Sequence, residues 1–215
     1  MLCLGLNTAG PACDIAIAQD SRILAELAKP MTRGQDAELP SLVEEACSMA
    51  NVRLNEFQRI GVVTGPGSFT GVRIGVAFAR GLALASNADC VGVSTLEAAL
   101  PEGQQGSAIV VLPAQKRAPD ITFWTQTFRS GEATAEPREQ SLGELVNLLE
   151  ARPHMVFGSA DQLQQSMPAL KIQSVSPAGI RAAQLAAIYD PEQHRPRPTY
   201  GRKPDALLPG GIERR

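Results

Sequence analysis

The fold is decided by residues 60–73, IGVVTGPGSFTGVR, where an apolar run passes through a glycine-rich turn into a helical pattern. The run at 60–64 predicts a buried strand, and the helical pattern continues to about Ala85. This order places backbone N–H groups and a helix N-terminus at a sheet edge, which suits an anion or the backbone of a partner. The alternative is a purely structural tight turn, in which Ser68 or Thr70 caps the helix.

The spacing of the glycines excludes two phosphate-binding motifs. No Gly-Lys-Ser/Thr follows, as a P-loop requires, and the third glycine falls one residue late for the dinucleotide fingerprint. Arg73 could bond a partner carboxylate or a nucleotide phosphate. The candidate residues of this turn are Gly65, Gly67, Ser68, Thr70, Gly71 and Arg73.

Two helical segments carry more apolar surface than a single sheet needs. The segment 37–49 is amphipathic, and the segment 71–85 is apolar nearly all round. Small residues recur every fourth position of 71–85 in two rows: Gly71, Gly75, Ala79 and Ala83, and then Ala77, Gly81 and Ala85. Glycine within a helix costs about 1 kcal/mol relative to alanine, so the rows indicate close approach of another backbone. The predicted interface residues are Leu39, Leu42, Val43, Ala46, Val72, Gly75, Val76 and Ala79. The alternative is that both helices simply pack on their own sheet.

The remaining patterns predict an α/β protein with hairpin strands first and helix-linked strands later. Strands are expected at 2–6, 13–18, 22–27, 90–93, 108–112, 121–128, 154–158 and 172–175, and helices from 94, from a capping box at 141 to about 150, and over 179–189. We expect a first domain at 1–100, a linker at 101–106, a smaller second domain at 107–190 and a proline-rich basic tail at 191–215.

Composition restricts the chemistry further. The 215 residues carry a formal net charge of -2, which provides no general attraction to nucleic acid or to anionic membranes. Four scattered cysteines without a CxxC pair indicate reduced, buried thiols. The only histidines, His154 and His194, form no HExxH or HxxxH motif, which argues against a histidine-paired metal site. No apolar run approaches the roughly 20 residues of a membrane span. The N-terminus lacks a basic segment, so we expect a cytoplasmic protein without a signal peptide.

The motif GPGSFTGVRIG at 65–75, followed by Gly92-Val93-Ser94-Thr95-Leu96, resembles the TsaB (YeaZ) family. The resemblance is strong over 60–97 and plausible over 1–100. It implies an actin-like ATPase (ribonuclease H-like) fold, with two lobes that each hold a mixed sheet flanked by helices.

The resemblance also implies a function. Members of this family are non-catalytic subunits in threonylcarbamoylation of tRNA adenosine 37 (t6A). They bind the catalytic paralogue TsaD, which is joined by the ATPase TsaE, and they contact tRNA only through that complex. The heterodimer, and a competing homodimer, are bundles of the first two helices of each partner. The chain itself would need no metal or cofactor, although ATP or ADP could sit at the heterodimer interface.

The sequence departs from the family at several positions. Asn7 stands where the family commonly has an acidic residue, and an amide cannot supply that charge to a metal. This departure weakens the first alternative, a stand-alone ATPase or phosphotransferase, for which Asp14 and Asp120 are the candidate metal ligands. A second alternative, a glycoprotease-like peptidase, lacks a nucleophile–base pair. A third is direct tRNA binding by the basic tail, which includes Arg195, Arg197 and Arg202.

Overall fold

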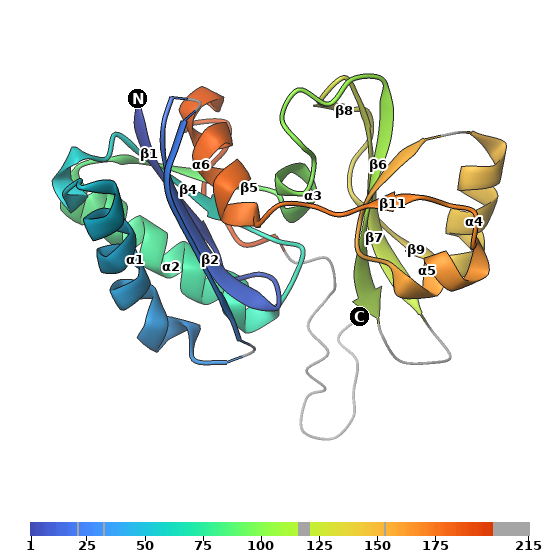
Figure 1. Cartoon of the computed structure of the whole chain (residues 1–215), viewed down its shortest axis with the longest axis horizontal. Coiled ribbons are helices and arrows are strands. Elements are labelled where there is room, and N and C mark those ends of the chain that lie inside the picture. The colour runs from blue at the N-terminus through green and yellow to red at the C-terminus, as the bar shows by residue number, and fades with distance from the viewer. Residues whose placement is uncertain (21, 32, 116–120, 153, 200–215) are drawn as a thin grey trace, which may run out of the picture.

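Two lobes, each built on its own sheet, stand side by side in a computed structural model of the chain (Figure 1). The structure describes residues 1–20, 22–31, 33–115, 121–152 and 154–199. Within this part, the first sheet has five strands in the order β3-β2-β1-β4-β5, and the second has six in the order β11-β10-β6-β7-β8 with β9 also paired to β7. This confirms the predicted two-lobed α/β architecture.

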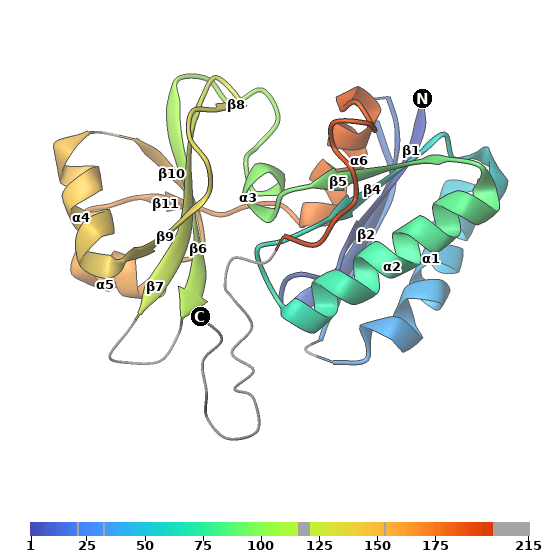
Figure 2. The same cartoon turned by 180° about the vertical axis from the view of Figure 1, so that it is seen from behind.

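The first lobe begins with an antiparallel meander and continues with parallel strands joined by helices. Its elements are β1 (Leu2–Asn7), β2 (Ala12–Gln19), β3 (Arg22–Pro30), α1 (Gln35–Ala50), η1 (Leu54–Glu56), β4 (Arg59–Val63), α2 (Phe69–Ser86), β5 (Asp89–Val93) and α3 (Thr95–Ala98). Helices α1 and α2 cover one face of the sheet, as Figure 2 shows from behind. The predicted strands and helices of this half are confirmed within a few residues at their ends, because their hydrophobic periods are long and regular.

The other face of the first sheet is covered by α6 (Ala178–Ile188), which comes from the C-terminal part of the chain. Gly5 and Gly61 lie opposite one another in adjacent strands β1 and β4. A Cβ at Gly5 would lie 2.0 Å from the Gly179 carbonyl oxygen, and one at Gly61 would lie 2.1 Å from that of Ala182. Two strand glycines therefore let α6 rest directly on the sheet backbone.

This placement corrects the predicted domain boundaries. The second domain was expected to include residues up to 190, but α6 packs on the first sheet, next to blue β1 in Figure 1. The beginning of the predicted tail also belongs to the first lobe. The Gly92 N–H donates to the His194 carbonyl oxygen at 2.7 Å, and the Thr199 N–H donates to that of Thr64 at 2.8 Å. The rest of the tail, with Arg202, lies outside the described residues.

The second lobe is a mixed sheet with helices on its outer face. Its elements are β6 (Ser107–Gln115), β7 (Thr122–Arg129), β8 (Glu132–Ala133), β9 (Arg138–Ser141), α4 (Leu142–Ala151), β10 (Met155–Gly158), α5 (Asp161–Ser166) and β11 (Ile172–Gln173). The capping box at Ser141 and Glu144 is confirmed. The sequence analysis missed β8, β9 and α5, which are short and polar and therefore lack a clear hydrophobic period.

Cysteine chemistry agrees with the expectation of free thiols. Cys3, Cys13 and Cys47 are buried, Cys90 is partly buried, and all four are free. Burial raises the pKa of Cys13 to about 11 and that of Cys90 to about 12, so these thiols stay protonated and act as small apolar side chains.

Candidate functional site

The glycine-rich turn packs against the turn that follows β1. The Ser68 N–H donates to the Ala9 carbonyl oxygen at 2.8 Å, and the Thr8 hydroxyl donates to the Gly71 carbonyl oxygen at 2.7 Å. A Cβ at Gly67 would lie 2.5 Å from the Ala9 oxygen, and one at Gly71 would lie 2.0 Å from the Thr8 oxygen. These two glycines are therefore required by contacts inside the first lobe.

Gly65 joins the turn to two other segments. Its φ is +101°, in the region that favours glycine, and its peptide bond to Pro66 is cis. Its carbonyl oxygen accepts the Thr95 N–H at 2.9 Å, and a Cβ on it would lie 2.7 Å from the Thr199 oxygen. The turn thus connects β4, α3 and the C-terminal segment.

The other turn residues surround the start of α2. The Ser68 hydroxyl oxygen accepts the Gly71 N–H at 3.2 Å and confirms the predicted N-cap, whereas Thr70 is exposed. The Arg73 guanidinium lies 3.8 Å from the centroid of the exposed Phe69 ring, a cation–π contact. That Arg73 binds a carboxylate or phosphate stays a prediction.

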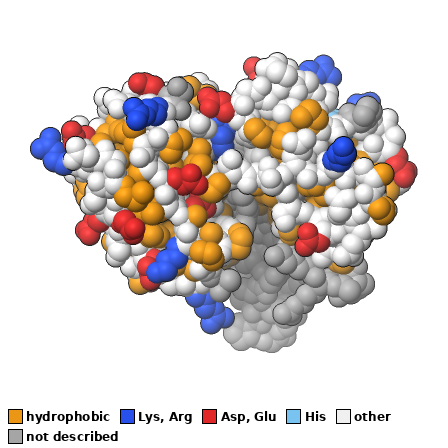
Figure 3. Space-filling view, viewed as in Figure 1, with side chains coloured by type: hydrophobic (Ala, Val, Ile, Leu, Met, Phe, Trp, Pro, Cys, Tyr) orange, Lys and Arg blue, Asp and Glu red, His pale blue; other side chains and the backbone are white. Residues whose placement is uncertain are grey.

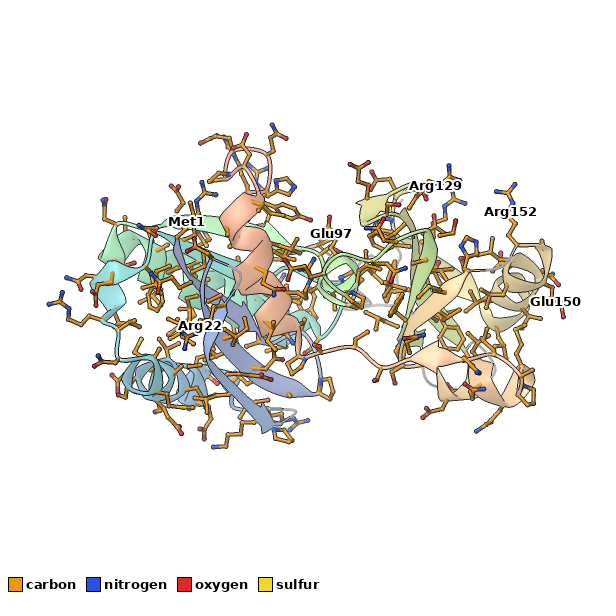
Figure 4. All side chains as sticks on the ribbon, turned by 45° about the horizontal axis from the view of Figure 1, so that its top comes forward. Met1, Arg22, Glu97, Arg129, Glu150 and Arg152 are labelled. Carbon is orange, nitrogen blue, oxygen red and sulfur yellow. The ribbon has the colours of Figure 1, made fainter. Side chains whose placement is uncertain are left out.

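The two lobes enclose a cavity of about 870 Å³. Its wall includes Gly65, Pro66, Ser94, Glu97, Trp124, Gln126, residues 133–137 and Thr199. Glu97, labelled in Figure 4, accepts the Tyr189 hydroxyl at 3.2 Å and the Ser94 N–H at 3.0 Å. Burial and the neighbouring Glu97 raise the pKa of Tyr189, so this hydroxyl remains a donor. The wall holds Glu97 and Glu136 but, among the described residues, no lysine or arginine.

The described wall offers no lysine or arginine to the phosphates of the magnesium nucleotide that an actin-like ATPase fold implies. Of its two carboxylates, Glu97 already accepts two hydrogen bonds. Asp14 is also occupied: its two oxygens accept the Gly179 N–H at 2.5 Å and the Asn7 amide at 2.7 Å. Burial raises the pKa of Asp14 to about 6. Among the described residues, no three His, Cys, Asp or Glu side chains gather as metal ligands, and Asp120 lies outside them.

The predicted interface residues lie in the core of the first lobe rather than on its surface. They are Leu39, Leu42, Val43, Ala46, Val72, Gly75, Val76 and Ala79. None of the apolar side chains in this set is more than 7% exposed. A Cβ at Gly75 would lie 2.3 Å from the Thr8 hydroxyl oxygen. The assignment of these residues to a partner surface is therefore wrong, because the most apolar face of each helix first covers its own sheet.

The outer face of α2 presents the second row of small residues instead. Ala77, Gly81 and Ala85 are exposed, and the Leu84 side chain next to them is 86% exposed. A Cβ at Gly81 would meet nothing within 4 Å. Figure 2 shows α2 crossing the front of the first lobe, with α1 beside it. The four-residue spacing detected this row in the sequence, but spacing alone could not tell which row faces outward.

By length and composition alone, helix α2 (Phe69–Ser86) is long and apolar enough to cross a membrane. In the structure, 33% of these 18 residues are buried. The side of α2 that carries Gly71, Gly75, Ala79 and Ala83 packs on the first sheet, so α2 takes the place of a core helix of the first lobe.

Comparisons with known proteins agree with the motif. The family model described as TsaD, tRNA N6-adenosine threonylcarbamoyltransferase, matches residues 29–117. The tRNA threonylcarbamoyladenosine biosynthesis protein TsaB of Escherichia coli is 35% identical over 96 residues, which span 45% of this chain and 41% of that protein. TsaB of Bacillus subtilis is 23% identical over 171 residues, 78% of this chain and 75% of that protein.

Solved structures show the same fold. A Pseudomonas aeruginosa protein described as similar to peptidase YEAZ superposes with a TM-score of 0.71 at 21% identity, over 94% of this chain and 99% of that one. A ROK hexokinase from Thermus thermophilus superposes with a TM-score of 0.52 at 14% identity, over 86% and 98% of the two chains. At these identities the likeness concerns the fold alone. Together, the glycine-rich motif, the sequence relatives and the two-lobed architecture make this chain similar to the TsaB (YeaZ) proteins, with an actin-like fold.

Proposed function

We propose that this chain is a non-catalytic subunit in tRNA threonylcarbamoyladenosine biosynthesis, and that it binds the threonylcarbamoyltransferase TsaD through the outer face of α1 and α2. The TsaB relatives are named for this pathway, and the TsaD model matches the segment that contains both helices. The chain would act in the cytoplasm, form a homodimer through the same face when alone, and reach tRNA through the complex.

One observation carries the interface: no contact among the described residues requires a glycine at position 81. It lies in the interior of an 18-residue helix, where glycine costs about 1 kcal/mol relative to alanine. The intrachain contacts that explain Gly71 and Gly75 are missing at Gly81, because nothing lies within 4 Å of its Cβ position. Close approach of a partner helix would explain a glycine here, with Ala77 and Ala85 extending the same shallow strip.

Exposed apolar side chains flank this strip. Leu84 is 86% exposed on α2, Phe69 is 46% exposed at its start, and Met49 is 56% exposed at the end of α1. Burying such side chains stabilises an association by about 1.5–3 kcal/mol each when burial is complete. Exposed charges of opposite sign, Arg80 on α2 and Glu45 on α1, could pair across a two-fold or pseudo-two-fold interface.

The match to TsaD supports a paired arrangement of related helices. Residues 29–117 include α1, β4, α2 and β5, and this stretch resembles both the TsaB proteins and the transferase family. Two proteins that carry equivalent helices can present equivalent surfaces to each other. TsaE binding and a nucleotide at the interface are further expectations of this proposal, to which we assign no described residue.

The decisive experiment is light scattering after size-exclusion chromatography, with the chain alone and mixed with TsaD of the same organism. We expect the parent chain to form a one-to-one complex, and Gly81→Leu to lose it. Gly143→Leu is the matched control, because Gly143 lies in α4 of the second lobe and also has open space around it. A Gly81→Leu protein that is folded and binds TsaD as the parent does would overturn the interface.

The two enzymatic alternatives, a stand-alone phosphotransferase and a peptidase, have less support from the described residues. The part of the inter-lobe cavity wall that the structure describes offers carboxylates, but no lysine or arginine, to a phosphotransfer substrate. For a peptidase, Ser107 and His154 line one groove of the second lobe, yet no hydrogen bond joins them, and the His154 Nδ1 has no partner among the described residues. The geometry of a nucleophile and its base is therefore not formed.

A further inference from the structure

The second lobe has a groove that the proposed function does not use. It has a volume of about 370 Å³ and lies on the face of the second sheet that also carries α4, beyond the C-terminal end of that helix. Its wall combines the strands β6, β7 and β9 with the residues that follow α4. It lies on the opposite lobe from α1 and α2, so what binds there is independent of the interface proposed above.

The groove gathers positive charge. Arg129, Arg138 and Arg152 all line it, and Glu136 is the one carboxylate among its described lining residues. The three arginines are exposed, and none forms an ion pair within the part of the chain that the structure describes. Glu132 lies opposite Arg129 in the β7–β8 pairing without bridging to it. Three guanidinium groups therefore face one carboxylate, in a protein whose net charge is slightly negative.

The arginines come from different elements and converge. Ser107 is opposite Arg129 in the β6–β7 register, and Arg138 is opposite Thr125 in the β7–β9 register. Arg152 follows the last residue of α4. Figure 4 shows Arg129 and Arg152 extending toward the same side of the second lobe, whereas Glu150 points elsewhere. Figure 3 shows blue side chains at the upper edge of this lobe.

The wall of the groove also contains polar side chains, namely the imidazole of His154 and the hydroxyls of Ser107, Thr127 and Thr134. The His154 Nδ1 is buried and has no hydrogen-bond partner among the described residues. The Ser107 hydroxyl is exposed. The Thr127 and Thr134 hydroxyl oxygens lie 2.7 Å apart, and the Thr134 hydroxyl donates to the Thr127 carbonyl oxygen at 3.1 Å, so these two hydroxyls are already hydrogen-bonded. Burial and the charge of Arg152 lower the pKa of His154, so this ring is held near its neutral form in the free protein.

We propose that this groove binds a phosphate group. Guanidinium groups match the oxygens of a phosphate in paired hydrogen bonds, and hydroxyl donors complete such a site. Phe128 is the one aromatic carbon ring among the described lining residues, and it is 2% exposed, so the groove offers no aromatic carbon ring on which a base could stack. The recognised chemistry is therefore the phosphate itself, either in a small phosphate ester or in the backbone of RNA.

The test uses the full chain and follows its two histidines by NMR. Inorganic phosphate is titrated at constant ionic strength, with chloride as the compensating anion. We expect the His154 ring signals to shift with saturation and the pKa of His154 to rise on binding. The charged groups around this ring are Arg129, Arg138, Arg152 and Glu136. His194 stacks on Tyr189 in the first lobe and serves as the internal control.

Arginine variants assign the binding to the groove. Arg129→Gln and Arg152→Gln should each weaken phosphate binding by about 5-fold, the ratio that corresponds to about 1 kcal/mol for an exposed charge-assisted contact. Arg22→Gln removes an exposed arginine of the first lobe, away from the groove in Figure 4, and should leave binding unchanged. Arg152→Lys keeps the positive charge but lacks the paired N–H donors of a guanidinium. It should therefore bind phosphate with an affinity between those of the parent and of Arg152→Gln.

A second titration with a twelve-residue oligouridylate distinguishes the two sources of phosphate. Tighter binding of the RNA, with a salt slope that decreases by about 0.7 for each arginine removed, identifies a nucleic-acid backbone. RNA that binds no tighter than inorganic phosphate identifies a small phosphate ester. His154 signals that respond to neither probe, or equal affinities of the parent and the folded Arg129→Gln/Arg152→Gln protein, would overturn the proposal.

Discussion

At the scale of the single residue, the glycines of α2 differ in the space around them. Gly71 and Gly75 are needed because side chains there would collide with the turn after β1. Gly81, six residues further along the same helix, has open space instead. The same residue type thus makes a close contact within the lobe at one position and lies on an open surface at another.

This difference predicts opposite effects of one substitution. Gly75→Ala should lower the free energy of unfolding by about 1–3 kcal/mol, because its Cβ overpacks against Thr8. Gly81→Ala should raise it by about 0.4–1 kcal/mol, because alanine is the better helix former and meets no obstacle. Urea unfolding at a protein concentration low enough to keep the chain monomeric measures both, with Gly143→Ala as the exposed control. Changes of the same sign at both positions would contradict the packing described here.

The buried carboxylate of Asp14 predicts a pH dependence of stability. The pKa of Asp14 is about 6 in the folded chain, against an ordinary value of 3.8. Between these two pH values the folded state therefore binds more protons than the unfolded state. Stability should therefore decrease as the pH rises from about 4 to about 6, by up to about 3 kcal/mol for this shift.

Chemical unfolding at a series of pH values measures this slope. Asp14→Asn cannot titrate and should lose the contribution, whereas Asp36→Asn, which changes an exposed carboxylate in the first turn of α1, should keep it. An Asp14→Asn protein with the parent's slope would show that another group is responsible.

At the scale of the element, α6 is the helix whose position the sequence pattern did not indicate. Its small residues Gly179, Ala182, Ala183 and Ala186 match the glycines of β1 and β4, so the helix lies close to the sheet. Arg59 also holds its C-terminal end: one guanidinium nitrogen donates to the carbonyl oxygens of Ala186, at 3.2 Å, and Tyr189, at 2.6 Å. A cation at this end also complements the helix dipole.

Removing this anchor should loosen α6 without unfolding the chain. A hydrogen bond to a charged group contributes about 1.5–3 kcal/mol, so Arg59→Gln should speed amide exchange in the last turn of α6 by about 10- to 100-fold. Amides of α4 in the second lobe should be unaffected. The control is Arg53→Gln, which removes an exposed ion pair with Glu56. Unchanged exchange in α6 of the Arg59→Gln protein would show that packing on the sheet alone holds the helix.

At the scale of the whole molecule, the two lobes have an actin-like arrangement, and the described wall of the cavity between them carries carboxylates but no lysine or arginine. Glu97 and Glu136 line it, and Asn7 and Asp14 bond to each other and to the backbone nearby. The architecture places α1 and α2 on one lobe and the arginine groove on the other.

The single tryptophan reports directly on that cavity. Trp124 lines it, so a ligand bound there should change its fluorescence. We expect magnesium ATP to leave the emission of the isolated chain unchanged, because the described cavity wall offers the phosphates no cation. N-acetyltryptophanamide provides the correction for absorption by ATP. A saturable change in the parent that Glu97→Gln alters would instead place a nucleotide between the lobes.

The sequence by itself determined the strand–turn–helix core, a cap at Ser68 or Thr70 and the α/β class, because hydrophobic periods and the glycine motif are local signals. The two-lobed fold followed from the resemblance that the glycine motif carries. The sequence also located both small-residue rows of α2. Only the tertiary structure decided which row faces outward, that α6 belongs to the first lobe, and that Arg129, Arg138 and Arg152 share a groove. These features depend on contacts between residues far apart in the chain, and local periodicity carries no information about which distant segments meet.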